Sequence, residues 1–273
     1  MLVVAFLALT GPACFRSSAT PELTIGEGVP FDAQNVTYVD LEALRGDADL
    51  AFVANSIESV LAPDLGTLMV EASGFTTLIT FVLDGERSMV AQGGIVESEL
   101  REYVSNLGYL VEEVGGKEVW SGPGVIGSIG LLGSGRIAMS SGIFEAGTIV
   151  SELEEKRDPG LPEQMGILID ELPAGTIMSL SRNCLFAAEG CQAIGISFNK
   201  KDAQLSSFTL VALFADESAA RAARNDLEAL FTGLSGSFSE VQTQVVENRF
   251  LASGDALSAV IFEELYTEFD FSP

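Results

Sequence analysis

The sequence predicts an α+β fold made of two related units, each an antiparallel sheet with helices packed on one face. Three observations support this prediction. Strand-like segments follow one another without a helix after each. Two pairs of them are joined by short turns, as in β-hairpins, and the order of elements recurs in the second half. With 273 residues, 47% of them hydrophobic, the chain can build a sizeable core.

In the first unit, alternating and β-branched residues predict strands, and a helical spacing of apolar residues predicts helices. Asp84-Gly85 marks the turn of the hairpin. Leu100, Tyr103, Val104 and Leu107 form the apolar stripe of a helix that ends at Gly108. The predicted order is strand 35–41, strand 66–73, hairpin 76–92, helix 100–107, strands 116–122 and 135–141, and helix 146–153.

The second unit repeats this order after a short helix at 162–172. Residues 175–181 resemble residues 66–73, and Ala220, Ala223, Leu227 and Phe231 form a second apolar stripe. The predicted order is strand 175–181, hairpin 192–214, helix 217–231, strand 249–254 and helix 257–265. Because one period covers a whole set of strands and helices, the pattern indicates a tandem duplication of a domain.

The predicted organisation has four parts. A signal peptide or lipobox occupies residues 1–19, and a tether rich in Pro and Gly occupies 20–34. The first α+β unit covers 35–158 and the second covers 159–273, with the charged and Pro-containing segment 156–162 at the boundary.

The N-terminal segment predicts export. Residues 2–9 are an apolar run, which is too short to span a bilayer but fits the h-region of a signal peptide. Ala13 and Cys14 follow, and the segment resembles the lipobox of bacterial lipoproteins, although Gly11 stands where that motif carries Leu or Val. The resemblance implies that Cys14 is lipidated. Two alternatives remain, cleavage after Ala19 or a buried strand of the mature protein.

The cysteines favour the same compartment. Of three cysteines, Cys184 and Cys191 remain if Cys14 is lipidated. They flank a short loop between strand-like segments, so we expect a disulfide, with two buried free thiols as the alternative. Disulfides persist in oxidising, extracytoplasmic environments.

Charge and composition exclude several functions. The chain has 39 acidic and 14 basic residues, a net charge of −25, so nucleic acid is not an expected partner. It has no histidine, which removes Ser-His-Asp and Cys-His nucleophiles and the commonest metal ligand.

Three short motifs resemble known sites but lack the required context. Residues 122–127 satisfy G-x-G-x-x-G, yet the glycines that follow oppose a helix, so we expect a hairpin and no dinucleotide. Ser197 and Lys200 match S-x-x-K in a predicted strand, without the partner motifs. Asp47 and Asp49 begin a calcium-like spacing that lacks its glycine.

These observations predict an extracytoplasmic protein of the bacterial cell envelope, held at a membrane by a lipid anchor or else secreted. The pattern looks like that of uncharacterised bacterial surface lipoproteins. We expect a non-enzymatic binding or scaffolding module without cofactor or metal, whose natural site is the groove between the units. One alternative is a carrier of an apolar ligand, favoured by 17 phenylalanines. The other is a hydrolase that uses carboxylates and a metal.

Overall fold

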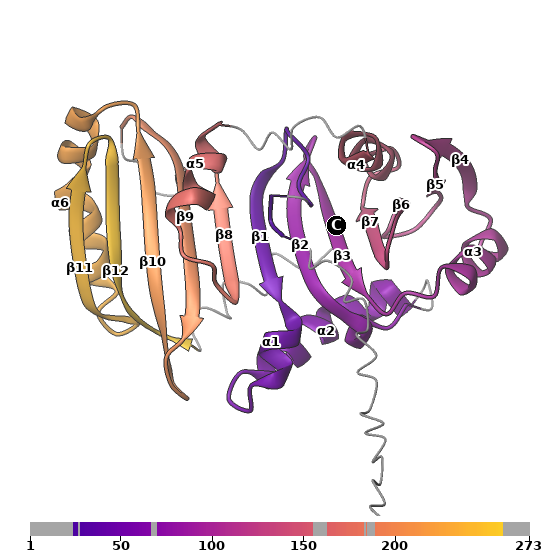
Figure 1. Ribbon diagram of the computed structural model, residues 1–273, viewed down its shortest axis with the longest axis horizontal. Coiled ribbons are helices and arrows are strands. Elements are labelled where there is room, and N and C mark those ends of the chain that lie inside the picture. The colour runs from indigo at the N-terminus through magenta and orange to yellow at the C-terminus, as the bar shows by residue number, and fades with distance from the viewer. Residues whose placement is uncertain are drawn as a thin grey trace, which may run out of the picture.

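The protein is built around one continuous sheet (Figure 1). The computed structural model describes residues 24–26, 28–66, 70–154, 163–182, 184 and 189–258. Within them, twelve strands pair in the order β11-β12-β10-β9-β8-β1-β2-β3-β7-β6-β5-β4, and every neighbouring pair is antiparallel.

The first half of the sheet contains seven strands. Its tight turns follow the chemistry of the sequence: Asp84-Gly85 has φ values of 52° and 89°, which suit a two-residue hairpin turn. The elements are β1 (Gln34–Asp40), α1 (Leu41–Gly46), α2 (Ala51–Gly66), the 3-10 helix η1 (Ala72–Gly74), β2 (Phe75–Leu83), β3 (Glu86–Gly93), α3 (Glu97–Asn106), β4 (Leu110–Val114), β5 (Lys117–Ser121), β6 (Ser128–Gly133), β7 (Arg136–Ser140) and α4 (Glu145–Glu154).

The second half contributes five strands. Its long helix begins where Asp216 accepts a hydrogen bond from the Ala219 amide at 2.9 Å, a standard N-cap. The elements are α5 (Glu163–Glu171), β8 (Ile177–Ser181), β9 (Cys191–Lys200), β10 (Leu205–Phe214), α6 (Glu217–Gly233), β11 (Phe238–Val246) and β12 (Arg249–Leu257).

Strands β1 and β8 join the two halves. They pair antiparallel from Val36 opposite Leu180 to Val39 opposite Ile177. The strand order is symmetric about this pair, because β1-β2-β3-β7-β6 on one side corresponds to β8-β9-β10-β12-β11 on the other. Strands β4 and β5 extend the first half beyond this common pattern.

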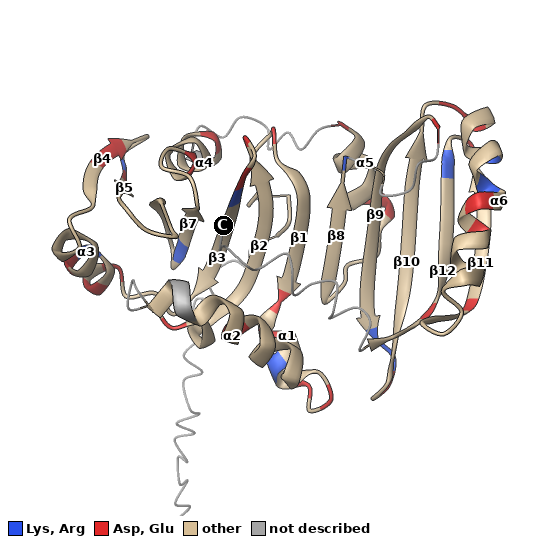
Figure 2. Cartoon of the chain, turned by 180° about the vertical axis from the view of Figure 1, so that it is seen from behind, with Lys and Arg blue, Asp and Glu red and all other residues tan. Residues whose placement is uncertain are grey.

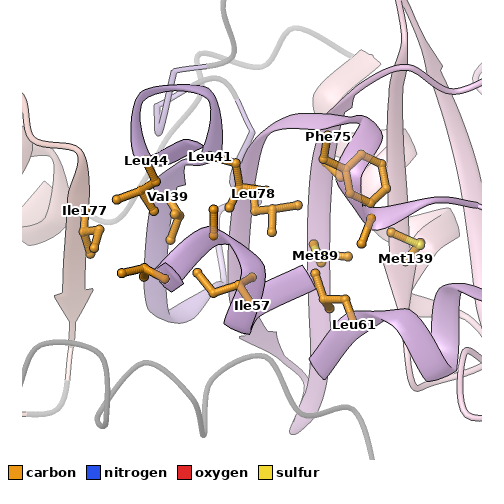
Figure 3. Packing of buried hydrophobic residues seen from close by; sticks show 14 of the residues in the cluster. Val39, Leu41, Leu44, Ile57, Leu61, Phe75, Leu78, Met89, Met139 and Ile177 are labelled. Atoms are coloured by element: carbon orange, nitrogen blue, oxygen red, sulfur yellow. The ribbon is translucent and has the colours of Figure 1, made fainter. Parts of the chain in front are cut away.

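Apolar side chains cover both faces of the sheet, because neighbouring residues of a strand point to opposite faces. Leu78 belongs to the cluster beneath α1, α2, α3 and α6, whereas Ile79 belongs to the cluster beneath α4 and α5. Figure 3 shows the first cluster, where Ile57 and Leu61 of α2 lie against the strands. Burial on both faces explains why the central strands read as nearly continuous apolar runs.

The predicted α+β class with antiparallel sheet is confirmed, and two details differ. The halves share one sheet where separate sheets were expected, since β1 and β8 pair. Helices lie on both faces, because strands buried on both sides need cover on both sides.

Some predicted elements also differ. The strand expected at 66–73 is wrong in its described part, because Gly66 ends α2 and Ala72–Gly74 form a 3-10 turn. The helix expected at 257–265 begins at Leu257, which belongs to β12, and the rest of it lies almost entirely outside the described residues. Cys14 and the proposed boundary at 156–162 also lie outside the described residues. Strands β4 and β11 were not predicted.

Charged residues are distributed over helices and strand ends (Figure 2). Among the helices that the structure describes, none is both long and apolar enough to cross a bilayer.

Candidate functional site

A pocket of about 510 Å³ lies at the junction of the two halves. We call it the junction pocket. Tyr38 and Asp40 of β1 line it from the first half, and Met178 of β8 and Asn199 of β9 line it from the second. The remaining lining residues come from the N-terminal segment, α5 and the connection from α5 to β8: Thr24, Ile25, Ile169, Leu172, Ala174, Gly175 and Thr176.

The walls of the junction pocket are held by backbone pairing across the halves. The Asp40 amide donates to the Thr176 carbonyl at 2.9 Å. Asn199 Nδ2 donates to the Ala174 carbonyl at 2.9 Å, which fixes the connection that leads into β8. The β1–β8 pairing and the contact of Asn199 with the connection thus hold two of the walls of the pocket.

The lining chemistry suits an apolar or amphipathic molecule. Ile25, Tyr38, Ile169, Leu172 and Met178 are the large apolar and aromatic side chains among its lining residues. Among the described lining residues Asp40 is the single charged one, and its Oδ1 also caps α1 by accepting from the Ala43 amide at 2.8 Å. The pocket thus offers an apolar surface with one carboxylate at its rim.

A second, more polar pocket of about 550 Å³ also reaches Asp40. Its lining is Asp40, Glu42, Thr76, Thr77, Gln92, Gly93, Gly94, Ser134 and Gly135. Asp40 therefore lies between an apolar hollow and a polar one.

Cys184 and Cys191 form a disulfide, with their Cα atoms 6.1 Å apart. The predicted pairing is thus present in the structure. It closes the loop that leads into β9, and both cysteines pack against the core under α6. The lipidation expected at Cys14 stays a prediction.

The G-x-G-x-x-G segment forms a loop between the antiparallel strands β5 and β6, in line with the expected hairpin context. A Cβ on Gly127 would lie 2.5 Å from the Ser141 carbonyl oxygen, so this glycine permits two backbones to touch. Gly122 lies over the ring of Tyr109, whose hydroxyl donates to the Ile126 carbonyl at 2.7 Å. Burial raises the pKa of that phenol. These glycines serve backbone packing.

The other motifs form structural contacts. Ser197 and Lys200 lie in β9, at positions that point to opposite faces. Lys200 binds both Asp47 and Asp49, at 2.8 Å from Asp49 Oδ2, and thereby joins β9 to the loop between α1 and α2. The hydrogen bond from Lys200 lowers the pKa of Asp47, and the two carboxylates raise the pKa of Lys200.

The candidate metal ligands in the part of the chain that the structure describes are acidic residues and cysteines. Across the described ranges there is no group of three or more Cys, Asp or Glu residues placed to hold a metal ion.

Comparison with known proteins defines the fold only. No protein-family model and no curated protein matches the chain. Its fold is similar to that of TP0453. Three crystal forms of TP0453 superpose with TM-scores of 0.56, 0.57 and 0.58 at 10% sequence identity. The matches cover 88–91% of this chain and 95–99% of TP0453.

Sequence reasoning placed a site between the two units but named none of the residues of the junction pocket. Tyr38 and Met178 are apolar positions of ordinary strands, so nothing in their local sequence distinguishes them. Asp40 carried a signal, since it stands directly before a helical segment, but that signal indicates a cap.

Proposed function

We propose that this protein is a non-enzymatic binding module of the bacterial cell envelope, and that the junction pocket takes an apolar or amphipathic small molecule. The observation that carries the proposal is the mostly apolar hollow built by both halves of the sheet. Ligand sites of this kind are concave, largely apolar and preformed, with few polar groups that fix orientation.

Three observations support the envelope location. The apolar run at 2–9 followed by Cys14 resembles the start of a lipoprotein. The Cys184–Cys191 disulfide fits an oxidising compartment. TP0453, whose fold is similar at 10% identity, is a Treponema envelope protein, and this location is consistent with it. On this proposal, the folded part lies outside the cytoplasm and a lipid on Cys14 holds it at a membrane.

A scaffold without a small ligand is the second candidate, and the strong negative charge with dispersed acidic residues suits it. The hydrolase alternative lacks comparable support, because the carboxylates of the described residues are dispersed and several pair with Lys or Arg.

Filling the junction pocket tests the ligand proposal. Ala174 is exposed at the mouth of the pocket, so Ala174→Trp reduces its volume without entering the core. Ala203→Trp, at an exposed position between β9 and β10, is the matched control. With diphenylhexatriene as an uncharged fluorescent probe, we expect the wild type and Ala203→Trp to bind and Ala174→Trp to lose about tenfold in affinity, roughly 1.4 kcal/mol. Equal binding by all three proteins would count against the pocket.

Asp40→Asn tests whether the carboxylate of Asp40 disfavours a ligand whose polar group is negatively charged. Asparagine is also a good N-cap, so α1 keeps its hydrogen bond while the charge disappears. We expect the variant to bind an anionic fatty-acid probe more tightly than the wild type does. Native mass spectrometry of protein purified from its own envelope checks whether a ligand is retained.

Cys14→Ala tests the anchor. We expect the variant to move from the membrane fraction to the soluble fraction of the envelope and to lose incorporation of radiolabelled palmitate. Unchanged fractionation of the variant would defeat lipidation at Cys14. Recovery of both the wild type and the variant in the soluble fraction would favour cleavage after Ala19.

A further inference from the structure

The last strand of the sheet, β4, presents an open edge beside a helix. In the described part of the chain it pairs with β5 alone. An unpaired strand edge offers N–H and C=O groups to a further strand, and charged side chains on the edge restrict which strands can pair with it. Leu110 and Val111 are 77% and 63% exposed on this strand, so their apolar side chains are open to a partner.

The turn of the β4–β5 hairpin fixes which backbone groups face outward. Gly115 and Gly116 have φ values of 57° and 78°, so Val114 and Lys117 flank a two-residue turn. The flanking pair is hydrogen-bonded, and hydrogen-bonded pairs alternate along an antiparallel ladder. Val111 and Glu113 consequently direct their N–H and C=O groups away from β5, toward the open edge.

A groove of about 430 Å³ separates β4 from α4. Glu112 and Val114 line it from the strand, and Phe144, Gly147, Thr148, Ser151 and Glu152 line it from the start and the face of α4. A Cβ on Gly147 would lie 3.7 Å from Glu112 Oε1 and 3.8 Å from a Val114 methyl group, which is ordinary contact, so a side chain larger than alanine at this position would fill the groove. We call this hollow the β4 groove.

The helix side of the groove is held in place by hydrogen bonds. Ser128 Oγ accepts from the Ala146 amide at 3.2 Å and donates to the Gly142 carbonyl. The Ser140 side chain accepts from the Gly142 amide at 3.1 Å. Phe144 is therefore presented on a fixed loop although it is 75% exposed. Preorganised apolar groups lower the entropic cost of binding.

The negative charge around β4 and the β4 groove favours a partner with basic residues. Glu112 and Glu113 lie on the edge strand, where Figure 2 shows acidic colour, and Glu152 lies across the groove. Lys117, on the neighbouring strand, is engaged by the Leu132 carbonyl at 3.3 Å. A second copy of β4 would place glutamates against glutamates, which disfavours self-pairing.

We infer that the open edge of β4 and the β4 groove bind an extended segment of another protein by strand addition, and that this segment alternates apolar with basic residues. Backbone hydrogen bonds to Val111 and Glu113 hold the added strand, and alternate side chains enter the groove beside Phe144. The site is separate from the junction pocket, so its test is independent of the proposed ligand.

Fluorescence anisotropy with a labelled peptide of alternating Val and Lys tests the inference on the full folded chain. Gly147→Leu fills the groove, and Gly166→Leu, on α5 where a Cβ meets open space, is its matched control. Val111→Pro removes an outward N–H, and Val111→Thr keeps it. We expect Gly147→Leu and Val111→Pro to weaken binding about tenfold or more, and the two controls to bind like the wild type.

Three results would overturn the inference. One is equal binding by Gly147→Leu and Gly166→Leu, with both folded as judged by their thermal transitions. A second is equal affinity for a Val–Glu peptide, which would remove the charge argument. The third is no peptide binding, together with sedimentation on phosphatidylcholine vesicles that Phe144→Ser abolishes, which would assign this surface to a membrane.

Discussion

One side chain, that of Lys200, connects the two halves at one end of the sheet. Its ammonium group binds Asp47 and Asp49 of the loop between α1 and α2, more than 150 residues away in sequence. These groups are partly exposed, so the contact orients the halves more than it stabilises them. Lys201, the next residue, binds Asp255 at 2.6 Å instead.

Replacing Lys200 by Met should raise the pKa of Asp47, because the hydrogen bond from Lys200 is the main cause of its lowering. In the wild type, a lowered folded-state pKa means that the carboxylate contributes stability above its unfolded pKa and loses it as the pH falls through the folded value. Lys200, whose pKa is raised, loses its contribution as the pH rises through its own folded value. NMR titration of the side-chain carboxyl carbons measures the pKa of Asp47 in the wild type and in Lys200→Met, with Lys201→Met as the control. An unchanged Asp47 pKa in Lys200→Met would contradict the contact.

At the scale of elements, three phenylalanines pack together between α6 and the sheet. Phe208 of β10, Phe231 of α6 and Phe238 of β11 have ring centroids 5.0–5.6 Å apart. Aromatic contacts at this spacing add to the energy of burial. The apolar stripe of α6 thus meets side chains from two strands of the sheet.

Phe208→Ala should lower the free energy of unfolding by about 3–5 kcal/mol, because the ring is buried and its removal leaves a cavity. Phe31→Ala, at a position that is mostly exposed, should change stability by less than about 0.5 kcal/mol. Urea unfolding with an unchanged m-value measures both. Similar losses for the two variants would show that the aromatic cluster does not hold α6.

The elements also show what local sequence can and cannot specify. The Asp84-Gly85 hairpin and the stripe of α6 were predictable because turn chemistry and helical spacing are local. Strand β4 was not, because an edge strand with four exposed residues lacks apolar alternation. Strand β11 alternates Val or Thr with Gln over residues 241–245, but the bulge near Glu240, where φ is 53°, breaks its pattern. The junction pocket depends on β1 meeting β8, and no local pattern encodes that pairing.

At the scale of the whole molecule, the β1–β8 pair joins the two halves in one continuous sheet. Ile177 of β8 belongs to the same cluster as Val39 of β1, and Leu180 belongs with Val36 on the other face. Thr37 and Ser179 hydroxyls lie 3.4 Å apart across the pair. Either half alone would expose a strand edge and part of each core.

Unfolding of the full chain should therefore occur in one cooperative transition, with equal calorimetric and van't Hoff enthalpies, although the sequence suggests two units. Leu78→Ala in β2 and Leu210→Ala in β10 each remove a buried side chain from one half of the same cluster. We expect each to cost about 2–5 kcal/mol and to lower the temperature of the whole transition, since the halves unfold together. Two calorimetric peaks, of which Leu78→Ala shifts only one, would mean that the halves are separate cooperative units and that the β1–β8 pair does not couple them.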